Sequence, residues 1–168
     1  GRAASLQQLG CDEDLLGATR QMLGAAEDDG DSLAMAALGT MYLLGQSCAP
    51  KRNLTWAVHW LTRAEELGQA DAQALMGFLH ASNVLREVYD YDGFVANVTR
   101  GRELYEQAAH GGSAFAAMAI GFRHAYGVGL RESCPDSAAM YEKGRGQTAP
   151  ANLPATALLS DSISEPPT

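Results

Sequence analysis

The chain has 168 residues and a mass of 17.8 kDa, which suits one domain with a hydrophobic core. Hydrophobic residues make up 46% of it and charged residues 19%, without an apolar run of about 18 residues, so the composition argues against a membrane-spanning helix and against wholesale disorder. The formal net charge of -8 has the wrong sign for gathering phosphates, so we expect neither a nucleic-acid partner nor an anionic membrane surface as a partner. Without a long apolar run, we also expect no direct membrane insertion by this chain.

The residue types favour helices over strands. The 29 alanines far outnumber the 8 valines and isoleucines combined. Alanine is the best helix former, whereas strands are enriched in β-branched residues. The composition therefore excludes an all-β fold.

Three similar octets mark the first helix of a repeated unit. In the first of them, apolar residues recur at i, i+3, i+4 and i+7 from Ala34 to Met41, which is typical of an amphipathic helix. The pattern recurs in the second copy and breaks at Arg123 in the third, so we expect the last copy to pack against something different or against nothing. The octets are residues 32–39 (SLAMAALG), 70–77 (ADAQALMG) and 114–121 (AFAAMAIG).

A second recurring segment supplies the other helix of each pair. Leu61, Ala64 and Gly68 reappear 44 residues later with Tyr105 in the place of Leu61, and Tyr141 lies 36 residues further on. Each pair can bury its apolar face only by stacking on the next, so we predict an α-solenoid of stacked antiparallel helix pairs over residues 1–147. It comprises a partial repeat over 15–30 and repeats over 30–68, 68–112 and 112–144, followed by a Pro-containing tail or linker at 148–168.

The helix starts are predicted from residues whose side chains cap free backbone N–H groups. These are Asp31 or Ser32, Asp71, Ser113 and Asp136.

The second repeat carries a long segment between its two helices, residues 82–100. A hairpin around Asp92-Gly93 is one way to fold it. Its aromatic residues Tyr89, Tyr91 and Phe94 either fold back over the solenoid or form a partner-binding surface, since aromatic side chains are enriched at interfaces.

The repeated unit resembles the Sel1-like repeat, a relative of the tetratricopeptide repeat. The match lies in the patterns A-x-x-x-L-G-x-x-Y-x-x-G and W-L-x-x-A-x-x-x-G and covers about residues 15–144. It is carried by Ala34, Leu38, Gly39, Tyr42, Gly45, Trp60, Leu61, Ala64 and Gly68.

A shorter segment is similar to the Sel1L/Hrd3 family. It runs from Ile120 to Leu130 (IGFRHAYGVGL) and on through Ser133 and Cys134 to Tyr141. This resemblance implies a luminal subunit of an endoplasmic-reticulum ubiquitin-ligase complex. The implied partners are a membrane RING ubiquitin ligase of the Hrd1 type, a luminal lectin and misfolded glycoprotein clients.

Two sequons suggest the compartment. Asn53-Leu54-Thr55 and Asn97-Val98-Thr99 are 44 residues apart, the offset that superimposes repeat one on repeat two, so both precede the second helix of a pair. We predict glycosylation at Asn53 and Asn97 in the lumen of the endoplasmic reticulum. The alternative is that Thr55 and Thr99 are helix caps beside coincidental asparagines. Because the chain begins with Gly1, we expect it to be a fragment of a longer protein, whose signal peptide or membrane anchor would not be visible in this sequence.

The three cysteines contain no C-x-x-C pair, which argues against a zinc ribbon or a redox motif. A disulfide between Cys11 and Cys48 is a hypothesis, motivated by the oxidising compartment and by the expected packing of the N-terminal helix near repeat one. Secreted bacterial Sel1-like proteins place paired cysteines in each repeat, and this chain does not.

No motif points to catalysis, to a metal or to a cofactor. The sequence has no G-x-S-x-G elbow, S-x-x-K, H-E-x-x-H or P-loop, so we expect a protein that is not an enzyme and has no cofactor. The histidines, including His80 and His124 at the position that Tyr42 fills in repeat one, are interpreted as packing residues. Trp60, and Trp56 one turn earlier, are both predicted to lie in the core.

The favoured function is therefore a non-catalytic scaffold of a Sel1L/Hrd3-like complex for endoplasmic-reticulum-associated degradation, which presents misfolded luminal proteins to a membrane ubiquitin ligase. The alternatives are a cytosolic peptide-binding adaptor with Sel1-like or TPR-like repeats and, less favoured, a secreted Sel1-like repeat hydrolase. Occupied sequons would separate the first two, and paired repeat cysteines with a nucleophile and a base would mark the third.

Overall fold

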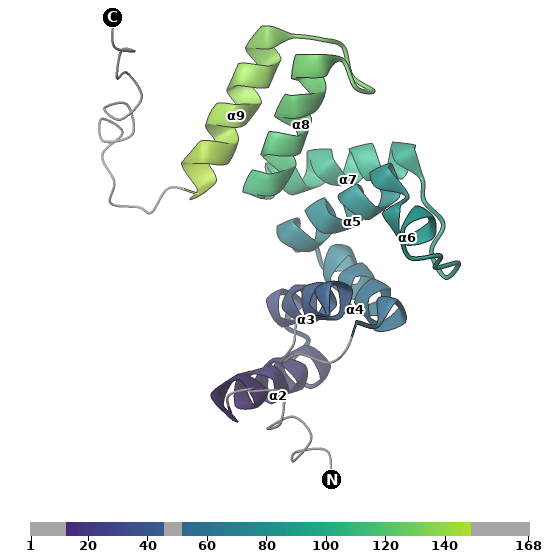
Figure 1. Ribbon diagram of the computed structural model, residues 1–168. Coiled ribbons are helices and arrows are strands. Elements are labelled where there is room, and N and C mark those ends of the chain that lie inside the picture. Colours follow the sequence, from purple (N-terminus) through teal and green to yellow (C-terminus); the bar gives the residue numbers. More distant parts are fainter. Residues whose placement is uncertain (1–12, 46–51, 149–168) are drawn as a thin grey trace, which may run out of the picture.

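The computed structural model describes residues 13–45 and 52–148, and all the regular structure in these ranges is helical. Figure 1 shows the helices following one another in chain order from α2 to α9, so that each helix pair stacks on the one before it. The helices are α2 (Glu13–Glu27), α3 (Ser32–Leu44), α4 (Leu54–Glu66), α5 (Ala70–Ser82), α6 (Val84–Glu87), α7 (Val98–His110), α8 (Ala114–Tyr126) and α9 (Cys134–Thr148).

The helices pack in three pairs, as the repeat pattern predicts. The most extensive contacts are between α3 and α4, α5 and α7, and α8 and α9, while α4 with α5 and α7 with α8 join one pair to the next. The predicted all-α solenoid of stacked helix pairs is confirmed. The predicted tail from residue 149 onward lies outside the described residues.

Glycines allow the two helices of a pair to approach closely. A Cβ atom on Gly101 in α7 would lie 2.8 Å from the carbonyl oxygen of Gly77 in α5, and one on Gly77 would lie 3.1 Å from the carbonyl oxygen of Gly101. The octet glycine is therefore a packing residue at the crossing of the two helices.

The core consists of two clusters of buried apolar side chains along the solenoid. Met35, Leu38 and Leu61 belong to the first, which extends from repeat one into repeat two, and Tyr105 and Ile120 belong to the second, around α7 and α8. Because each cluster takes side chains from more than one helix pair, the repeats depend on their neighbours for burial.

The third repeat is not broken at Arg123, contrary to the sequence prediction. Helix α8 packs on α7 and α9 as its counterparts pack on their neighbours. The guanidinium carbon of Arg123 lies 5.1 Å from the centre of the Tyr105 ring, so this cation rests on α7 and does not disturb the packing.

The residues between α5 and α7 do not form the hairpin considered for Asp92-Gly93. The segment instead leaves α5 at Asn83, whose φ of 52° is left-handed, and forms the short helix α6. Leu85 on α6 is fully buried in the first core cluster, so it anchors the segment to the solenoid.

Two of the predicted helix caps are confirmed and two are wrong. Asp31 and Ser113 accept backbone N–H groups at the starts of α3 and α8. The cap of α5 is the side chain of Gln69, which accepts the N–H of Ala72 at 2.6 Å, and not Asp71. Helix α9 begins before Asp136, whose own N–H is accepted by the Oγ of Ser133 at 3.3 Å.

Asp71 instead links two repeats. The hydroxyl of Ser113, a side chain only 1% exposed, donates to the Oδ1 of Asp71 at 3.0 Å and accepts the N–H of Ala116 at 3.4 Å.

We expect Ser113→Ala to lower the free energy of unfolding by about 1–2 kcal/mol, because it removes both a helix cap and a hydrogen bond between repeats. Urea denaturation followed by circular dichroism measures this. Ser32→Ala, at the start of α3 where Asp31 is the cap, is the control and should cost about 0.5 kcal/mol or less. Equal losses for the two variants would contradict the linking role of Ser113.

Candidate functional site

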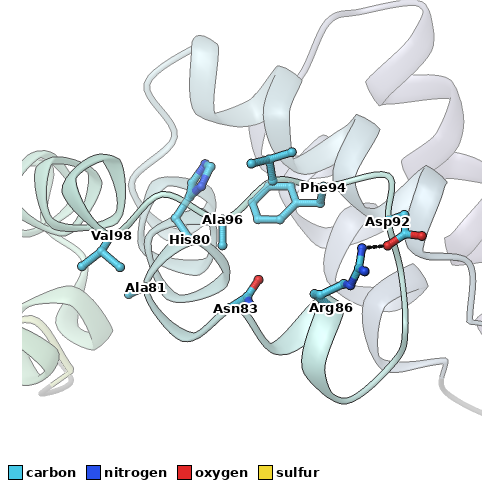
Figure 2. Close-up of a pocket in the computed structure, with 9 residues that line it drawn as sticks. His80, Ala81, Asn83, Arg86, Asp92, Phe94, Ala96 and Val98 are labelled. Carbon is cyan, nitrogen blue, oxygen red and sulfur yellow. Dashed lines mark ion pairs between the residues drawn. The ribbon is translucent and has the colours of Figure 1, made fainter.

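A pocket of about 390 Å³ lies where the segment between α5 and α7 passes the end of α5. Figure 2 shows His80 and Phe94 on one side of it and Arg86 and Asp92, which form an ion pair, on the other. Ala81 and Val98 add apolar wall, and its volume falls in the usual range for ligand sites.

His80 is the polar side chain at this pocket with an unsatisfied atom. Its Nδ1 is buried and has no hydrogen-bond partner among the described residues. The centres of its ring and of the Phe94 ring are 4.6 Å apart. Burial lowers the pKa of His80 below the usual 6.5, with opposing effects from Glu65, which raises it, and Arg100, which lowers it. The imidazole is therefore neutral near pH 7.

The two charged side chains that line the rim of the pocket compensate each other. Arg86 pairs with Asp92, and the amide of Asn83 donates to Glu87 at 3.3 Å. Nearby, Arg100 of α7 pairs with Glu65 of α4 at 2.5 Å, across the boundary between repeats one and two. Because the charges of Arg86 and Asp92 offset each other, the pocket favours a neutral ligand.

The aromatic residues predicted as a partner surface divide between the two alternatives considered. Tyr91 and Phe94 fold back against the first core cluster, and the Tyr91 hydroxyl donates to Thr55 Oγ1 at 3.3 Å. Tyr89 is 39% exposed, with the guanidinium carbon of Arg52 4.8 Å from its ring centre. Of the three, Phe94 contributes to the pocket and Tyr89 to the outer surface.

The two tryptophans differ in burial. Trp60 is 2% exposed, so its predicted place in the core is confirmed. Trp56 is 47% exposed, so the same prediction for it is wrong. The repeat offsets place Arg100 and Asp136 at the position of Trp56, and these polar counterparts are the signal that would have indicated its exposure.

Both sequon asparagines cap helices. The Oδ1 of Asn53 accepts the N–H of Trp56 at 3.1 Å, and the Oδ1 of Asn97 accepts the N–H of Arg100 at 3.0 Å, with both asparagines exposed. The helix caps are thus the asparagines themselves, not Thr55 and Thr99 as the alternative interpretation held. An N-glycosidic bond forms at Nδ2 and leaves Oδ1 as an acceptor, so capping and glycosylation are compatible.

The proposed disulfide cannot be located, because Cys11 and Cys48 lie outside the described residues; Cys134 is exposed and free. Over residues 13–45 and 52–148, no three His, Cys, Asp or Glu side chains gather as a metal site would require. In the same part of the chain, none of the helices combines the length and hydropathy needed to cross a bilayer.

Sequence reasoning named His80 only as a packing residue and missed Asn83, Arg86 and Asp92. The available signal was the extra length of the segment that holds them, since an insertion in a repeat maps to a loop on one face.

Comparison with known proteins identifies the fold. No protein-family model matches the chain, and no curated protein matches its sequence. Among solved structures, it is similar to a Sel1 repeat protein from Oxalobacter formigenes, with a TM-score of 0.59 and 23% identity over 76% of this chain and 89% of that one. The fold is that of Sel1-repeat proteins.

A second Sel1-repeat structure is a protective antigen present in uropathogenic Escherichia coli, described as displaying an SLR fold. It matches with a TM-score of 0.60 and 23% identity over 77% of this chain. The match covers only 25% of the antigen, so this chain corresponds to about a quarter of that longer protein. The resemblance to the Sel1-like repeat is thus supported at the level of the fold.

Proposed function

We propose that this chain is a non-catalytic scaffold that binds other proteins. Its Sel1-repeat fold offers an extended surface made of successive helix pairs, an architecture suited to binding. The two charged side chains that line its pocket, Arg86 and Asp92, pair with each other, an arrangement better suited to recognition than to proton transfer.

More specifically, we propose that the scaffold belongs to a Sel1L/Hrd3-like complex for endoplasmic-reticulum-associated degradation. In that complex it would present misfolded luminal glycoproteins to a membrane RING ubiquitin ligase, together with a luminal lectin. The sequence resemblance over residues 120–141 supports this assignment.

The observation that carries the luminal assignment is the geometry of the two sequons. Asn53 and Asn97 are exposed, occupy equivalent positions in successive repeats, and have Oδ1 engaged as a cap with Nδ2 left for a glycan. Glycosylation at these positions would need no change in the fold.

We expect the full-length protein in its own cells to carry high-mannose glycans at both positions, so that endoglycosidase H increases its electrophoretic mobility. Asn53→Asp and Asn97→Asp should each remove one glycan. Because aspartate caps a helix as well as asparagine does, these variants isolate the glycan from the cap. Co-immunoprecipitation of the RING ligase with the full-length protein tests the complex. An unglycosylated protein at both sites would contradict the luminal assignment and favour the cytosolic adaptor.

A further inference from the structure

Three equivalent positions in the repeats have different hydrogen-bonding environments. Tyr42, His80 and His124 each lie three residues after an octet glycine. In repeat three, the Nδ1 of His124 lies 3.0 Å from the carbonyl oxygen of Arg131, which belongs to the segment joining α8 and α9. A carbonyl oxygen only accepts, so this nitrogen carries the proton and donates. In repeat two, the Nδ1 of His80 is buried without such an acceptor.

A backbone hydrogen bond is missing at the same place. The N–H of Asn53 donates to the carbonyl oxygen of Tyr42 at 3.0 Å, and that of Ser133 donates to His124 at 2.9 Å. Asn97 is their counterpart, and among the described residues its N–H makes no backbone bond to His80. The longer segment of repeat two therefore leaves the N–H of Asn97 and the carbonyl oxygen of His80 unbonded to each other, whereas the other two repeats form the equivalent hydrogen bond.

The strap, residues 92–96, is weakly held. Within the described structure its backbone groups make no backbone hydrogen bond. It is fixed by Phe94, whose ring packs against His80 and the first core cluster, and by the ion pair of Asp92 with Arg86, both of whose side chains are exposed. Exposed ion pairs contribute little stability, so the main cost of moving the strap is the loss of the Phe94 packing, which the apolar side chain of a ligand replaces.

We propose that the pocket between the end of α5 and the strap binds an extended peptide segment of a partner protein. A peptide carbonyl accepts a hydrogen bond from His80 Nδ1, and the apolar side chain beside it packs against Ala81 and Val98, which line the pocket from α5 and α7. In repeat three, the carbonyl of Arg131 accepts the hydrogen bond of His124, and the half-buried Leu130 precedes it in the chain. The peptide gives His80 of repeat two an equivalent carbonyl and an equivalent apolar side chain. In the unbound structure Nδ1 is closed off from solvent, so the peptide displaces the strap to reach it.

The chemistry of the pocket favours this ligand over others. A buried ring nitrogen without a hydrogen-bond partner is costly, and an arriving carbonyl removes that cost by drawing the proton to Nδ1, the tautomer that His124 adopts. Burial lowers the pKa of His80, so its ring meets the peptide in the neutral state. The unpaired backbone groups of the strap offer an edge along which an extended chain can form main-chain hydrogen bonds. Since the rim charges are paired, a neutral, apolar segment is preferred, as an unfolded client exposes. In this respect the inference rests on the proposed scaffold function.

The test measures binding of a fluorescein-labelled peptide that copies residues 126–133 of this chain, by fluorescence anisotropy with the 168-residue protein. We expect saturable binding, with His80→Phe weakening it about tenfold because the ring is kept and the donor is lost. His124→Phe is the matched control. It removes the His124 donor, which already has an acceptor within the chain. The variant should therefore lower the melting temperature and leave the peptide affinity unchanged.

A second variant, Ala96→Trp, fills the pocket while retaining His80 and should abolish binding. Circular dichroism verifies that each variant is folded. The inference is overturned if the peptide does not bind at about 1 mM, if His80→Phe and His124→Phe bind it equally, or if Ala96→Trp binds it as well as the native chain. Co-immunoprecipitation of the ligase by full-length protein carrying His80→Phe separates the two proposals. Ligase capture without peptide binding leaves the scaffold function standing and removes this site.

Discussion

Leu85→Ala will lower the free energy of unfolding by about 2–5 kcal/mol, the cost of removing a fully buried leucine from a core. Leu85 is 0% exposed and belongs to the cluster that joins repeats one and two, although it lies on a four-residue helix outside the repeated unit. Urea denaturation monitored by circular dichroism measures the change.

Val88→Ala is the matched control for Leu85. Val88 follows the same short helix and is 66% exposed, so its truncation should change stability by about 0.5 kcal/mol or less. If both variants had small and equal effects on the free energy of unfolding, α6 would not be anchored in the core. The pocket would then lack the fixed wall that the peptide proposal requires, since Leu85 holds the segment from which the strap returns.

The fold was predictable because its information is repeated. A helix pattern that occurs three times, with glycines at matching positions, indicates both the helices and the reason why they stack. The caps were less predictable, since aspartate, serine and glutamine all suit a cap and the choice depends on where the turn places them. Asp71 is an example, because Gln69 caps α5 and Asp71 instead accepts the hydrogen bond of the Ser113 hydroxyl.

The candidate site was predictable only in part, because it lies in the segment that is not repeated. The aromatic residues of the segment were visible in the sequence, but whether they turn inward depends on the anchor Leu85, for which no periodic pattern exists. His80 and His124 are indistinguishable in the sequence pattern. Their environments differ because the connecting segments that pass them have different lengths, and the path of a long segment is set by tertiary packing.

Gly101→Ala will destabilise the protein by about 1–3 kcal/mol, the usual cost of overpacking a close contact. The new Cβ would lie 2.8 Å from the carbonyl oxygen of Gly77 and 3.0 Å from the backbone nitrogen of Ala81. Both are backbone atoms of α5, so no side chain can rotate to relieve the clash, and α5 and α7 have to move apart. Alanine is a better helix former than glycine, which by itself stabilises the protein by up to about 1 kcal/mol. The measured loss of stability is therefore the cost of the clash minus this gain.

Gly24→Ala supplies the matched control, since Gly24 also lies inside a helix. A Cβ there meets only the carboxylate of Asp28, at 3.9 Å, so the substitution should stabilise the protein by up to about 1 kcal/mol. Changes of opposite sign in the free energy of unfolding for the two variants would show that Gly101 is needed for the close contact between α5 and α7. If Gly101→Ala were instead stabilising, α5 and α7 could not be in contact at these glycines in solution. The pocket at the end of α5 would then lose its geometric basis, because α7 carries Val98, one of its walls.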